Sequence, residues 1–463
     1  MMFEPGVYKN RRATLKKQLG SGLALFLGNG ESPINYLANA YPFRQDSSFL
    51  YFFGLATPGL AAVVDVDSGE DVIFGDDITL EDVIWMGDLP KIKERASTVG
   101  VMRTAALTNL AETVSQAKAQ GRKILYLPPY RQEIITNLTG LLGIPEKEVK
   151  RNASVDLIKA VVAQRSTKSE EEIAEIEKAL SVSREMYLAA MKMTRPGLYE
   201  SDIVGAVEGI ALARGCQTAF PSILTMNGQI FHNLCHGNKL ERGRLLVIDA
   251  GASSGLGYAS DITRTIPVSG KFTAKQREIY EIVLNGQLEA ISLMKPGTPF
   301  KDIHLAVARR MASGLKELGL MKGDVREAVA AGAHALFFPH GLGHMLGLDV
   351  HDMEGLGENF VGYDETVSRS EQFGLAYLRM ARKLQPGFVL TVEPGIYFIP
   401  PLVEKWKAEK KFSEFIDYAK VDGYRDFTGV RIEDDVLITE EGSRVLGRMI
   451  PKRVKDLAKA MAG

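Results

Sequence analysis

The chain has 463 residues, of which 45% are hydrophobic and 24% charged, with a formal net charge of −1. This balance is typical of a soluble globular protein, and the length predicts two or three domains. A nearly neutral chain without an apolar run of 18 residues excludes a surface built for nucleic acid and a membrane-spanning helix.

The cysteine content and the first residues bear on the compartment. The chain has two cysteines, Cys216 and Cys235, which cannot crosslink a chain of this length. The opening residues, MMFEPGVYKNRRATLKK, contain no apolar h-region and no small-residue cleavage site. We therefore expect no secretory signal and a reducing, cytoplasmic location.

Residues 23–75 contain short apolar runs broken by Gly, Asn and Asp, and we interpret these runs as strands. The run LAAVVDVDSGEDVIF predicts a hairpin that turns at Asp67-Ser68-Gly69. Strand and helix patterns alternate to about Val155. The pattern predicts an N-terminal α/β domain over residues 1–165.

The next part of the chain begins with a helix-start signal. Ser169 followed by Glu172 forms a capping box, in which each side chain accepts a hydrogen bond from the other residue's backbone. Apolar residues then recur at helical spacing. A second capping box opens at Thr273 and predicts a helix to about Met294. We assign residues 166–463 to a second domain.

This second domain contains repeated motifs. The pattern Pro-Gly-x4-Asp-Ile that begins at Pro196 returns at Pro296, and LERGRLLVIDAG at Leu240 matches LQPGFVLTVEPG at Leu384. Each copy of the second motif is followed by a strand-like segment with an acidic residue, ASDITRTIPV and VRIEDDVLIT. The repeats predict two related halves, each of which supplies two carboxylates from two strands.

These four carboxylates are Asp249, Asp261, Glu393 and Glu433. Burial of an unpaired charge in an apolar strand costs several kcal/mol. One interpretation is that each residue ends a strand and faces water. Because all four belong to a duplicated pattern, a shared positive centre between the halves explains them better.

Histidines accompany the carboxylates. Three of the seven in the chain, His340, His344 and His351, lie in the glycine-rich run HGLGHMLGLDVH. A lone histidine is more often a core or surface residue, but three in one run favour a site. Four carboxylates and one imidazole suit two divalent cations, best Mn²⁺, with Co²⁺, Fe²⁺ or Zn²⁺ as alternatives. Two such cations can activate a hydroxide and polarise a carbonyl, so the set predicts metal-assisted hydrolysis.

The motifs VIDAG, SDITRT, HGLGHMLGLDVHD, TVEPGIY and RIEDD, in this order, resemble the pita-bread metallopeptidases and their aminopeptidase P branch. YPFRQDSSFLYFFG and IWMG around Trp85 extend the resemblance to the first domain. The resemblance implies an α/β (α+β) chain: a creatinase-like N-terminal domain, then a pita-bread domain with a pseudo-two-fold repeat and a curved antiparallel sheet. It also implies a metallo-aminopeptidase that hydrolyses the bond between an N-terminal residue and a following proline.

The resemblance assigns the metal ligands residue by residue. It implies that Asp261 and Glu433 bridge two metal ions, that Asp249 binds one of them, and that His344 and Glu393 bind the other.

It likewise assigns the catalytic residues. His232 in QIFHN would lie near the scissile bond, and His340 and His351 would bind the substrate and the tetrahedral intermediate. Arg431 would orient the carboxylates, and Glu393 would relay a proton.

The resemblance also implies partners: peptides with proline in second position, no nucleic acid and no membrane, and a second copy of the chain in a homodimer or homotetramer, where Trp85 can reach a neighbour's site. Two stretches, residues 355–383 and 401–427, are longer than the family pattern leads us to expect. Such insertions lie on the surface and can reshape the mouth of a site.

Three alternatives stay open at this point. An Xaa-Pro dipeptidase would use the same ligands, although YPFRQDSSF favours the aminopeptidase. A non-catalytic pita-bread binding protein would typically lack ligands that are present here. A serine hydrolase would use Ser253 in the run GASSG, but its nucleophile requires a following helix, and the next residues indicate a turn and a strand.

Overall fold

The computed structural model describes residues 2–462. The chain forms two compact units, one of the residues up to Arg165 together with Met353–Phe360, and one of Ser166–Asp352 together with Val361 onward. Both units combine helices with strands, which confirms the predicted α/β class.

The first unit is built on a five-stranded mixed sheet of order β6-β5-β4-β1-β7. Its strands are β1 (Leu23–Leu27), β4 (Ala61–Asp65), β5 (Asp71–Phe74), β6 (Arg103–Ala105) and β7 (Ile124–Tyr126). β4 and β5 pair antiparallel from Ala61 opposite Phe74 to Val64 opposite Asp71, which confirms the predicted hairpin. β7 and β6 extend the sheet in parallel at its two ends.

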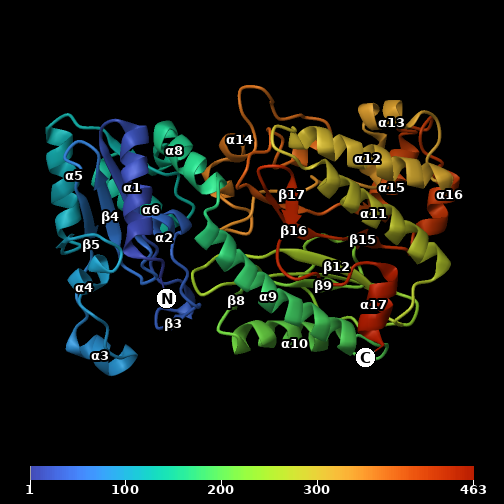
Figure 1. Ribbon diagram of the computed structural model, residues 1–463, viewed down its shortest axis with the longest axis horizontal. Helices are drawn as coiled ribbons and strands as arrows, with labels where there is room; N and C mark the ends of the chain where they lie inside the picture. Colours follow the sequence, from blue (N-terminus) through green and yellow to red (C-terminus); the bar gives the residue numbers. More distant parts are fainter. Residues whose placement is uncertain (1, 463) are drawn as a thin grey trace. The chain divides into compact units, whose positions relative to one another are not determined.

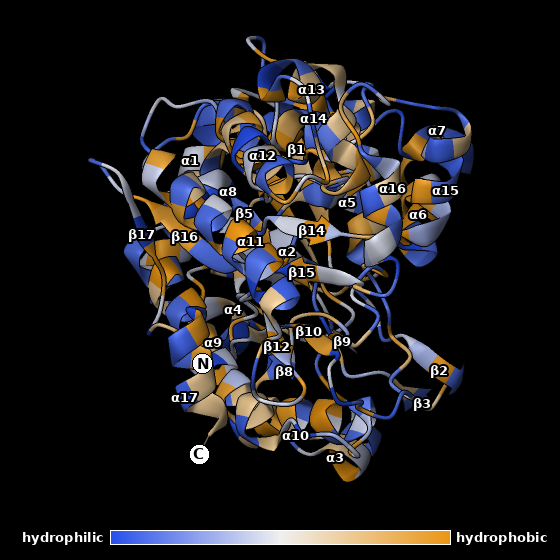
Figure 2. Cartoon of the chain, turned by 90° about the vertical axis from the view of Figure 1, so that its right-hand side faces the viewer, coloured by the Kyte–Doolittle hydropathy of each residue, from blue (hydrophilic) through white to orange (hydrophobic). Residues whose placement is uncertain are grey.

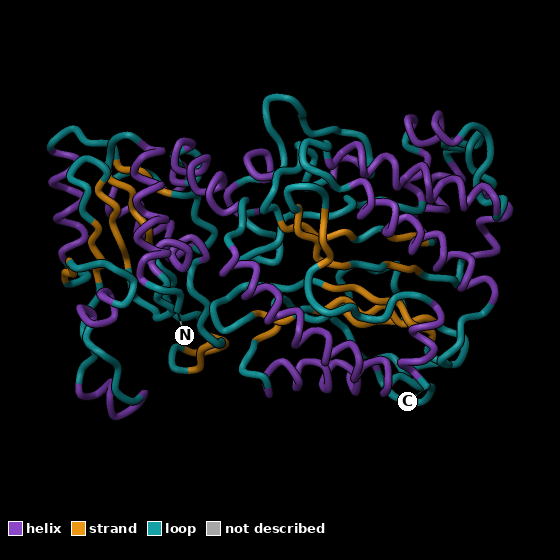
Figure 3. The backbone as a smooth tube through the Cα atoms, in the orientation of Figure 1, coloured by secondary structure: helices purple, strands orange, loops and turns teal. Residues whose placement is uncertain are grey.

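Helices lie on both sides of this sheet (Figure 3). They are α1 (Pro5–Leu19), α2 (Ser47–Phe53), α3 (Leu80–Met86), α4 (Ile92–Ser97), α5 (Asn109–Ala119), α6 (Gln132–Leu142), α7 (Glu146–Val149) and α8 (Val155–Ser166). The strands' alternating apolar residues pack on one face against Val114 of α5 and Leu138 of α6. A separate two-stranded ribbon, β2 (Pro33–Tyr36) with β3 (Asn39–Ala40), completes this unit.

The strand prediction for residues 23–75 is wrong at α2. Asp46 caps this helix, since its side chain accepts a hydrogen bond of 2.9 Å from the Phe49 amide, and Gly54 ends it at a φ of +62°. All seven residues of α2 are buried. A helix buried on every side shows no amphipathic period, so its sequence is indistinguishable from a buried strand.

The second unit repeats one arrangement, a helix pair followed by antiparallel strands. The first copy contains α9 (Glu170–Met193), α10 (Glu200–Ala213), β9 (Ile223–Thr225), β10 (Leu245–Ala250) and β12 (Ile262–Pro267). The second contains α11 (Ala274–Leu293), α12 (Phe300–Glu317), β13 (Val389–Val392), β16 (Asp434–Ile438) and β17 (Ser443–Val445). In Figure 1 the two helix pairs lie on opposite sides of the strands.

The two copies meet at their strands. β10 pairs with β12, and β13 pairs with β16, both antiparallel. A bridge between Thr263 and Glu433 then joins the two halves. The predicted pair of related halves is therefore present, and the two halves meet at the motifs SDITRT and RIEDD.

Both predicted capping boxes start helices of this unit. The Ser169 amide donates to Glu172 at 3.1 Å at the start of α9, and the Gln276 amide donates to Thr273 at 3.2 Å at the start of α11. Hydrophilic and hydrophobic residues alternate along α12 (Figure 2), and its buried side includes Ile303. This amphipathic pattern explains why α12 packs with one face against α11 and α13.

Shorter elements complete the molecule: β8 (Gln217–Thr218), β11 (Ala252–Ser253), α13 (Val325–Ala331), η1 (Ala333–Leu336), η2 (Glu354–Leu356), α14 (Glu358–Val361), η3 (Leu375–Tyr377), β14 (Gly395–Tyr397), α15 (Pro400–Ala408), α16 (Tyr418–Val421), η4 (Asp422–Tyr424), β15 (Gly429–Arg431) and α17 (Val454–Met461). None of the helices within residues 2–462 has the length and apolar character that a membrane span requires.

Candidate metal centre

The four acidic residues come together from the ends of four strand segments. Asp249 lies near the end of β10, Asp261 just before β12, Glu393 just after β13 and Glu433 just before β16. Asp249, Asp261 and Glu433 are buried, with exposed fractions of 9%, 5% and 2%. These three therefore do not face water, and all four line one cavity.

His344 points its Nε2 atom into this carboxylate cluster. Its Nδ1 lies 3.0 Å from the Met345 carbonyl oxygen and must therefore carry a hydrogen to donate. Nε2 is left as the acceptor, 3.5 Å from Asp261 Oδ2 and 3.7 Å from Glu393 Oε1. Asp261, His344 and Glu433 offer ligand atoms that all lie within 4.8 Å of one another. A histidine fixed in this tautomer is arranged as metal-binding histidines are.

The charges of the cluster are not balanced within the described residues. Burial, and then repulsion by neighbouring carboxylates, raises the pKa of Asp261 and of Glu433 well above the ordinary range. Burial likewise raises the pKa of Glu393 to about 8. Asp249 Oδ1 and Asp261 Oδ1 are buried without a hydrogen-bond partner. Divalent cations among these oxygens would remove the repulsion and satisfy both atoms, so the residues fit a metal site.

Arg431 orients part of the cluster. Its guanidinium lies 2.6 Å from Asp249 Oδ2, donates to Thr263 Oγ1 at 3.1 Å and donates to the Tyr397 hydroxyl at 3.0 Å. The Thr263 hydroxyl donates in turn to Glu433 Oε2 at 2.6 Å. One arginine and one threonine thus fix a carboxylate from each half of the repeat.

Three further histidines line the same cavity: His232, His340 and His351. His340 Nδ1 lies 2.8 Å from the Gly341 carbonyl oxygen, and its Nε2 accepts from the Tyr397 hydroxyl at 2.9 Å. Burial lowers the pKa of His340 to about 3 and also lowers the pKa of His232, so both rings are neutral at pH 7. His351 lies against His344, with ring centroids 4.2 Å apart.

The cavity has a volume of about 650 Å³ and two chemically different parts. One part is the cluster of carboxylates and histidines, together with Arg379 and Arg431. The other is apolar and includes Phe231, Phe373, Tyr377 and Leu402. Such a volume lies within the range of small-ligand sites, and the few convergent polar groups would orient a bound molecule.

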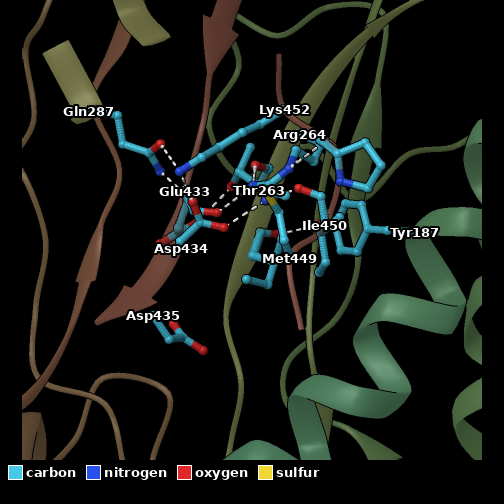
Figure 4. Close-up of polar contacts among 12 residues, drawn as sticks. Tyr187, Thr263, Arg264, Gln287, Glu433, Asp434, Asp435, Met449, Ile450 and Lys452 are labelled. Atoms are coloured by element: carbon cyan, nitrogen blue, oxygen red, sulfur yellow. Dashed lines mark hydrogen bonds and ion pairs between the residues drawn. The ribbon is translucent and has the colours of Figure 1, made fainter. Parts of the chain in front are cut away.

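A second buried cluster adjoins Glu433, and we call it the ion cluster: Arg264, Gln287, Asp434 and Lys452 (Figure 4). Arg264 NH2 and Lys452 Nζ each lie 2.6 Å from the Asp434 carboxylate. Gln287 donates to the same carboxylate at 3.0 Å. Every charged group in this cluster has an opposite partner inside the protein.

The ion cluster also holds the backbone beside the metal ligands. Arg264 donates to the carbonyl oxygens of Thr263 at 2.9 Å and Glu433 at 2.6 Å, and Gln287 donates to that of Val392 at 3.2 Å. These carbonyls belong to, or adjoin, the segments that carry Asp261, Glu393 and Glu433.

Sequence reasoning missed several residues of the site. Tyr397, Thr263 and Asp435 all lie inside the motifs TVEPGIY, SDITRT and RIEDD, so the motifs themselves were the available signal. Asp435 Oδ2 accepts from the Asp261 amide at 3.0 Å. Arg379 lies outside every motif and gave no signal. Ser253 is followed by a turn and then β12 rather than by a helix, so the structural requirement of a serine nucleophile is not met.

This fold and this site define a metal-dependent hydrolase, in which carboxylates and an imidazole gather around cations beside a substrate cavity. A model described as metallopeptidase family M24 matches residues 174–440, and one described as aminopeptidase P, N-terminal domain, matches residues 8–126. The chain belongs to metallopeptidase family M24.

Known proteins resemble the chain over nearly its full length. It is 33% identical to Xaa-Pro aminopeptidase of Escherichia coli (strain K12), over 98% of this chain and 97% of that one. It is 31% identical to Xaa-Pro dipeptidase of Homo sapiens, over 96% of this chain and 89% of that one. The structure of E. coli aminopeptidase P with the inhibitor Pro-Leu has a TM-score of 0.81 and 31% identity, over 100% and 99% of the two chains. These findings confirm the predicted family and fold.

Proposed function

We propose that this protein removes the N-terminal residue from peptides that carry proline in second position. The observation that carries the proposal is the cluster of four carboxylates, three of them buried, that lines a cavity of about 650 Å³ together with His344. The E. coli relative named Xaa-Pro aminopeptidase matches this chain over 97% of its own length, and the E. coli aminopeptidase P structure has the same fold, which supports the choice of substrate.

The site would hold two divalent cations, with Mn²⁺ the best match to an oxygen-rich ligand set. Asp261 and Glu433 would bridge them, Asp249 would bind one, and His344 with Glu393 would bind the other. When bound, the cations would supply a Lewis acid and a hydroxide at neutral pH. Zinc remains an alternative, because one structure of the E. coli enzyme is zinc-substituted and product-bound.

The chain's own residues would handle the substrate. A bond before proline has no N–H, and the ring fixes φ, so a site for it must accept a tertiary amide. His232 would lie near the scissile bond, and His340 and His351 would bind the substrate and the tetrahedral intermediate. Glu393 would relay the proton of the attacking water to the leaving proline nitrogen.

We also propose the organisation of the molecule in the cell. The boundary between the domains would fall between residues 165 and 166, and the protein would be cytoplasmic. We expect a homodimer or homotetramer, because α3 exposes Leu80, Ile84 and Trp85 by 72–79% of their surfaces. Exposed apolar side chains that cluster in this way mark interaction surfaces. A strictly monomeric and fully active enzyme in light scattering would contradict the assembly.

A peptide panel tests the substrate. With Mn²⁺ added, we expect fast release of Xaa from Xaa-Pro-Yaa, slower release from Xaa-Pro and little from Xaa-Ala. An N-acetylated Xaa-Pro-Yaa peptide should be cleaved poorly, because the free amine would bind at the metal centre. Equal rates on Xaa-Ala and Xaa-Pro peptides would reject proline specificity. Cleavage of Xaa-Pro alone would assign the dipeptidase activity for which the human relative is named.

A further inference from the structure

A buried ion pair adjoins the histidine motif and has no part in the proposed reaction. Lys168 Nζ lies 2.9 Å from Asp352 Oδ2, and each side chain is 1% exposed. Lys168 precedes α9 and Asp352 directly follows His351, so 184 residues separate the partners. Neither partner is among the residues that line the cavity. Because charges are costly to take out of water, a pair buried so completely requires an explanation.

Asp352 closes the loop that follows His344. Its backbone amide donates to the Met345 carbonyl oxygen at 2.8 Å, which joins the two ends of residues 345–352. Its side-chain Oδ1 accepts a hydrogen bond of 3.2 Å from the Asp349 amide, inside the same loop. The carboxylate that pairs with Lys168 therefore also holds the loop in shape.

The Met345 carbonyl oxygen connects this loop to the metal centre. It accepts from the Asp352 amide, and it also lies 3.0 Å from His344 Nδ1. The second contact fixes the tautomer of His344 and directs its Nε2 into the carboxylate cluster. At the other end of the loop, the ring of His351 lies 4.2 Å from that of His344. The placement of both rings thus depends on the loop that Asp352 closes.

The loop packs so closely against the ion pair that no side chain fits at Gly347. A Cβ at this position would lie 2.6 Å from Asp352 Oδ2 and 3.0 Å from Lys168 Cε. Since both atoms belong to the buried pair, an added methyl group would have to displace one partner from the other. Gly347 therefore offers a way to disturb the pair without removing a charge.

The backbone of Lys168 is fixed to the second half of the repeat. Its amide donates to the Gly387 carbonyl oxygen at 2.8 Å, and the Gly387 amide donates to the Ile438 carbonyl oxygen at 2.9 Å. Gly387 has a φ of +83°, a conformation that glycine adopts readily. Ile438 ends β16, the strand that directly follows Glu433. The ammonium group that reaches Asp352 is thus held from a strand of the metal centre itself.

The ion pair also marks two places where the chain passes from one compact unit to the other. Ser166 is the first residue of the second unit, and Asp352 is its last residue before Met353–Phe360, which belong to the first. Met353 is buried and has a φ of +63°. A non-glycine residue keeps such a conformation only where the surrounding structure holds it. Asp352 is the one residue between this strained position and His351.

We propose that Lys168 and Asp352 are positioning residues for the metal centre, an inference that rests on the proposed function. Their ion pair holds the loop 345–352 in place. Through the Met345 carbonyl oxygen, this loop orients His344 toward the cations and keeps His351 beside it. Loss of the pair should therefore weaken metal binding and slow turnover in protein that is still folded.

The test measures the Kd for Mn²⁺ by calorimetry, and kcat on an Xaa-Pro-Yaa peptide at saturating Mn²⁺, in variants whose fold is verified by circular dichroism. Asp352→Asn keeps an oxygen that can accept from the Asp349 amide but removes the charge. It should weaken Mn²⁺ binding roughly 10–100-fold, as loss of an outer partner of a metal ligand does. Its kcat should stay reduced at saturating Mn²⁺, because added metal does not restore the position of His351. Lys168→Arg, which keeps the charge, should bind Mn²⁺ more tightly than Lys168→Met.

A second variant and a matched control complete the design. Gly347→Ala keeps both charges and displaces them, so it should weaken Mn²⁺ binding in the same way as Asp352→Asn. Asp71→Asn is the control, because Asp71 pairs with the buried Arg12 at 2.8 Å in the first unit. It should lower the free energy of unfolding but leave the Kd for Mn²⁺ and kcat unchanged.

The outcomes separate this inference from the proposed function. A wild type that binds Mn²⁺ but cleaves no Xaa-Pro peptide would refute the proposed substrate and leave the comparison of Kd values in force. The positioning role is overturned if folded Asp352→Asn and Gly347→Ala proteins bind Mn²⁺ as tightly as the wild type. It is also overturned if Asp71→Asn weakens Mn²⁺ binding as much as Asp352→Asn does, since the effect would then follow from lost stability alone.

Discussion

Glu433 and Asp434 are adjacent in the chain and equally buried, yet the protein treats their carboxylates in opposite ways. Burial and the neighbouring acids raise the pKa of Glu433 well above its ordinary range. Burial alone would also raise the pKa of Asp434, but Arg264 and Lys452 lower it below the ordinary value. The strand alternates sides here, so one carboxylate enters the metal centre and the next enters the ion cluster.

The comparison shows where the protein has left room for cations. Asp434 forms ion pairs with the side chains of Arg264 and Lys452. The main positively charged side chain near the four carboxylates of the metal centre is Arg431. The charge of Asp434 is thus balanced by side chains of the protein itself, whereas the charges of the metal-centre carboxylates are left for bound cations to balance. The same strands serve both purposes, because the ion cluster fixes the backbone from which the ligands project.

The largest effect should follow from removing a bridging carboxylate. Asp261→Ala or Glu433→Ala should abolish nearly all peptidase activity, well beyond the roughly 10–100-fold cost of losing an outer partner of a metal ligand. Metal content by elemental analysis and kcat/KM should fall together. Ser253→Ala should leave both nearly intact, and a dead Ser253→Ala enzyme would favour the serine mechanism instead.

Breaking the ion cluster should cost stability. Arg264→Met leaves Asp434 with half of its cations, and loss of one partner of a buried pair costs about 3–5 kcal/mol. The triple variant Arg264→Met/Asp434→Leu/Lys452→Met, which removes all three charges, should recover part of that loss in urea unfolding. Arg310→Met is the control, because Arg310 pairs with Glu289 on the surface, 53% exposed, where a pair contributes about 0–1 kcal/mol. Equal losses of unfolding free energy in Arg264→Met and Arg310→Met would contradict the structural role of the ion cluster.

A substitution of Thr263, which lies between the metal centre and the ion cluster, should have an effect of intermediate size on metal binding. Thr263→Val keeps the shape of the side chain but removes the hydrogen bonds to Glu433 and from Arg431. Metal affinity, measured by calorimetry, should fall roughly 10–100-fold. Thr113→Val on α5, far along the sequence in the other unit, should not change it.

A buried histidine pair, His304 and His334, sharpens the comparison, because no acidic residue is among the groups that shift the pKa of either ring. No ring nitrogen of His304 or His334 has a hydrogen-bond partner among the described residues. Burial lowers the pKa of His304 to about 3 and that of His334 to about 4, and His304 is further lowered by His334 and His340. The rings therefore stay neutral in the folded protein.

This pair predicts a loss of stability in acid. Below about pH 6.5 the unfolded chain binds protons that the folded rings do not, so stability falls as pH decreases toward the folded pKa values. For His334 alone the loss from pH 7 to pH 5 is about 2 kcal/mol. In urea unfolding, His334→Leu should reduce the decrease in the free energy of unfolding between pH 7 and pH 5 by this amount. If the pH dependence of the free energy of unfolding does not change in this variant, the ring of His334 is protonated in the folded state.

The sequence predicted the metal centre better than its surroundings. Asp249, Asp261, His344, Glu393 and Glu433 lie in contiguous motifs, because each is fixed by its own strand or loop. The ion cluster joins Arg264 and Asp434, which lie inside the motifs, to Gln287 and Lys452, which lie in none, and no local pattern marks contacts across more than 180 residues.

Titration of Mn²⁺ into metal-free protein at pH 7 tests the central contrast most directly. We expect two ions per chain to bind the wild type with release of protons, since Glu393 with a pKa of about 8 is mostly protonated until metal enters. Glu433→Gln should lose at least one ion, whereas Arg310→Met should bind both. Full activity of the metal-free protein, or a wild type that binds no Mn²⁺, would contradict the account.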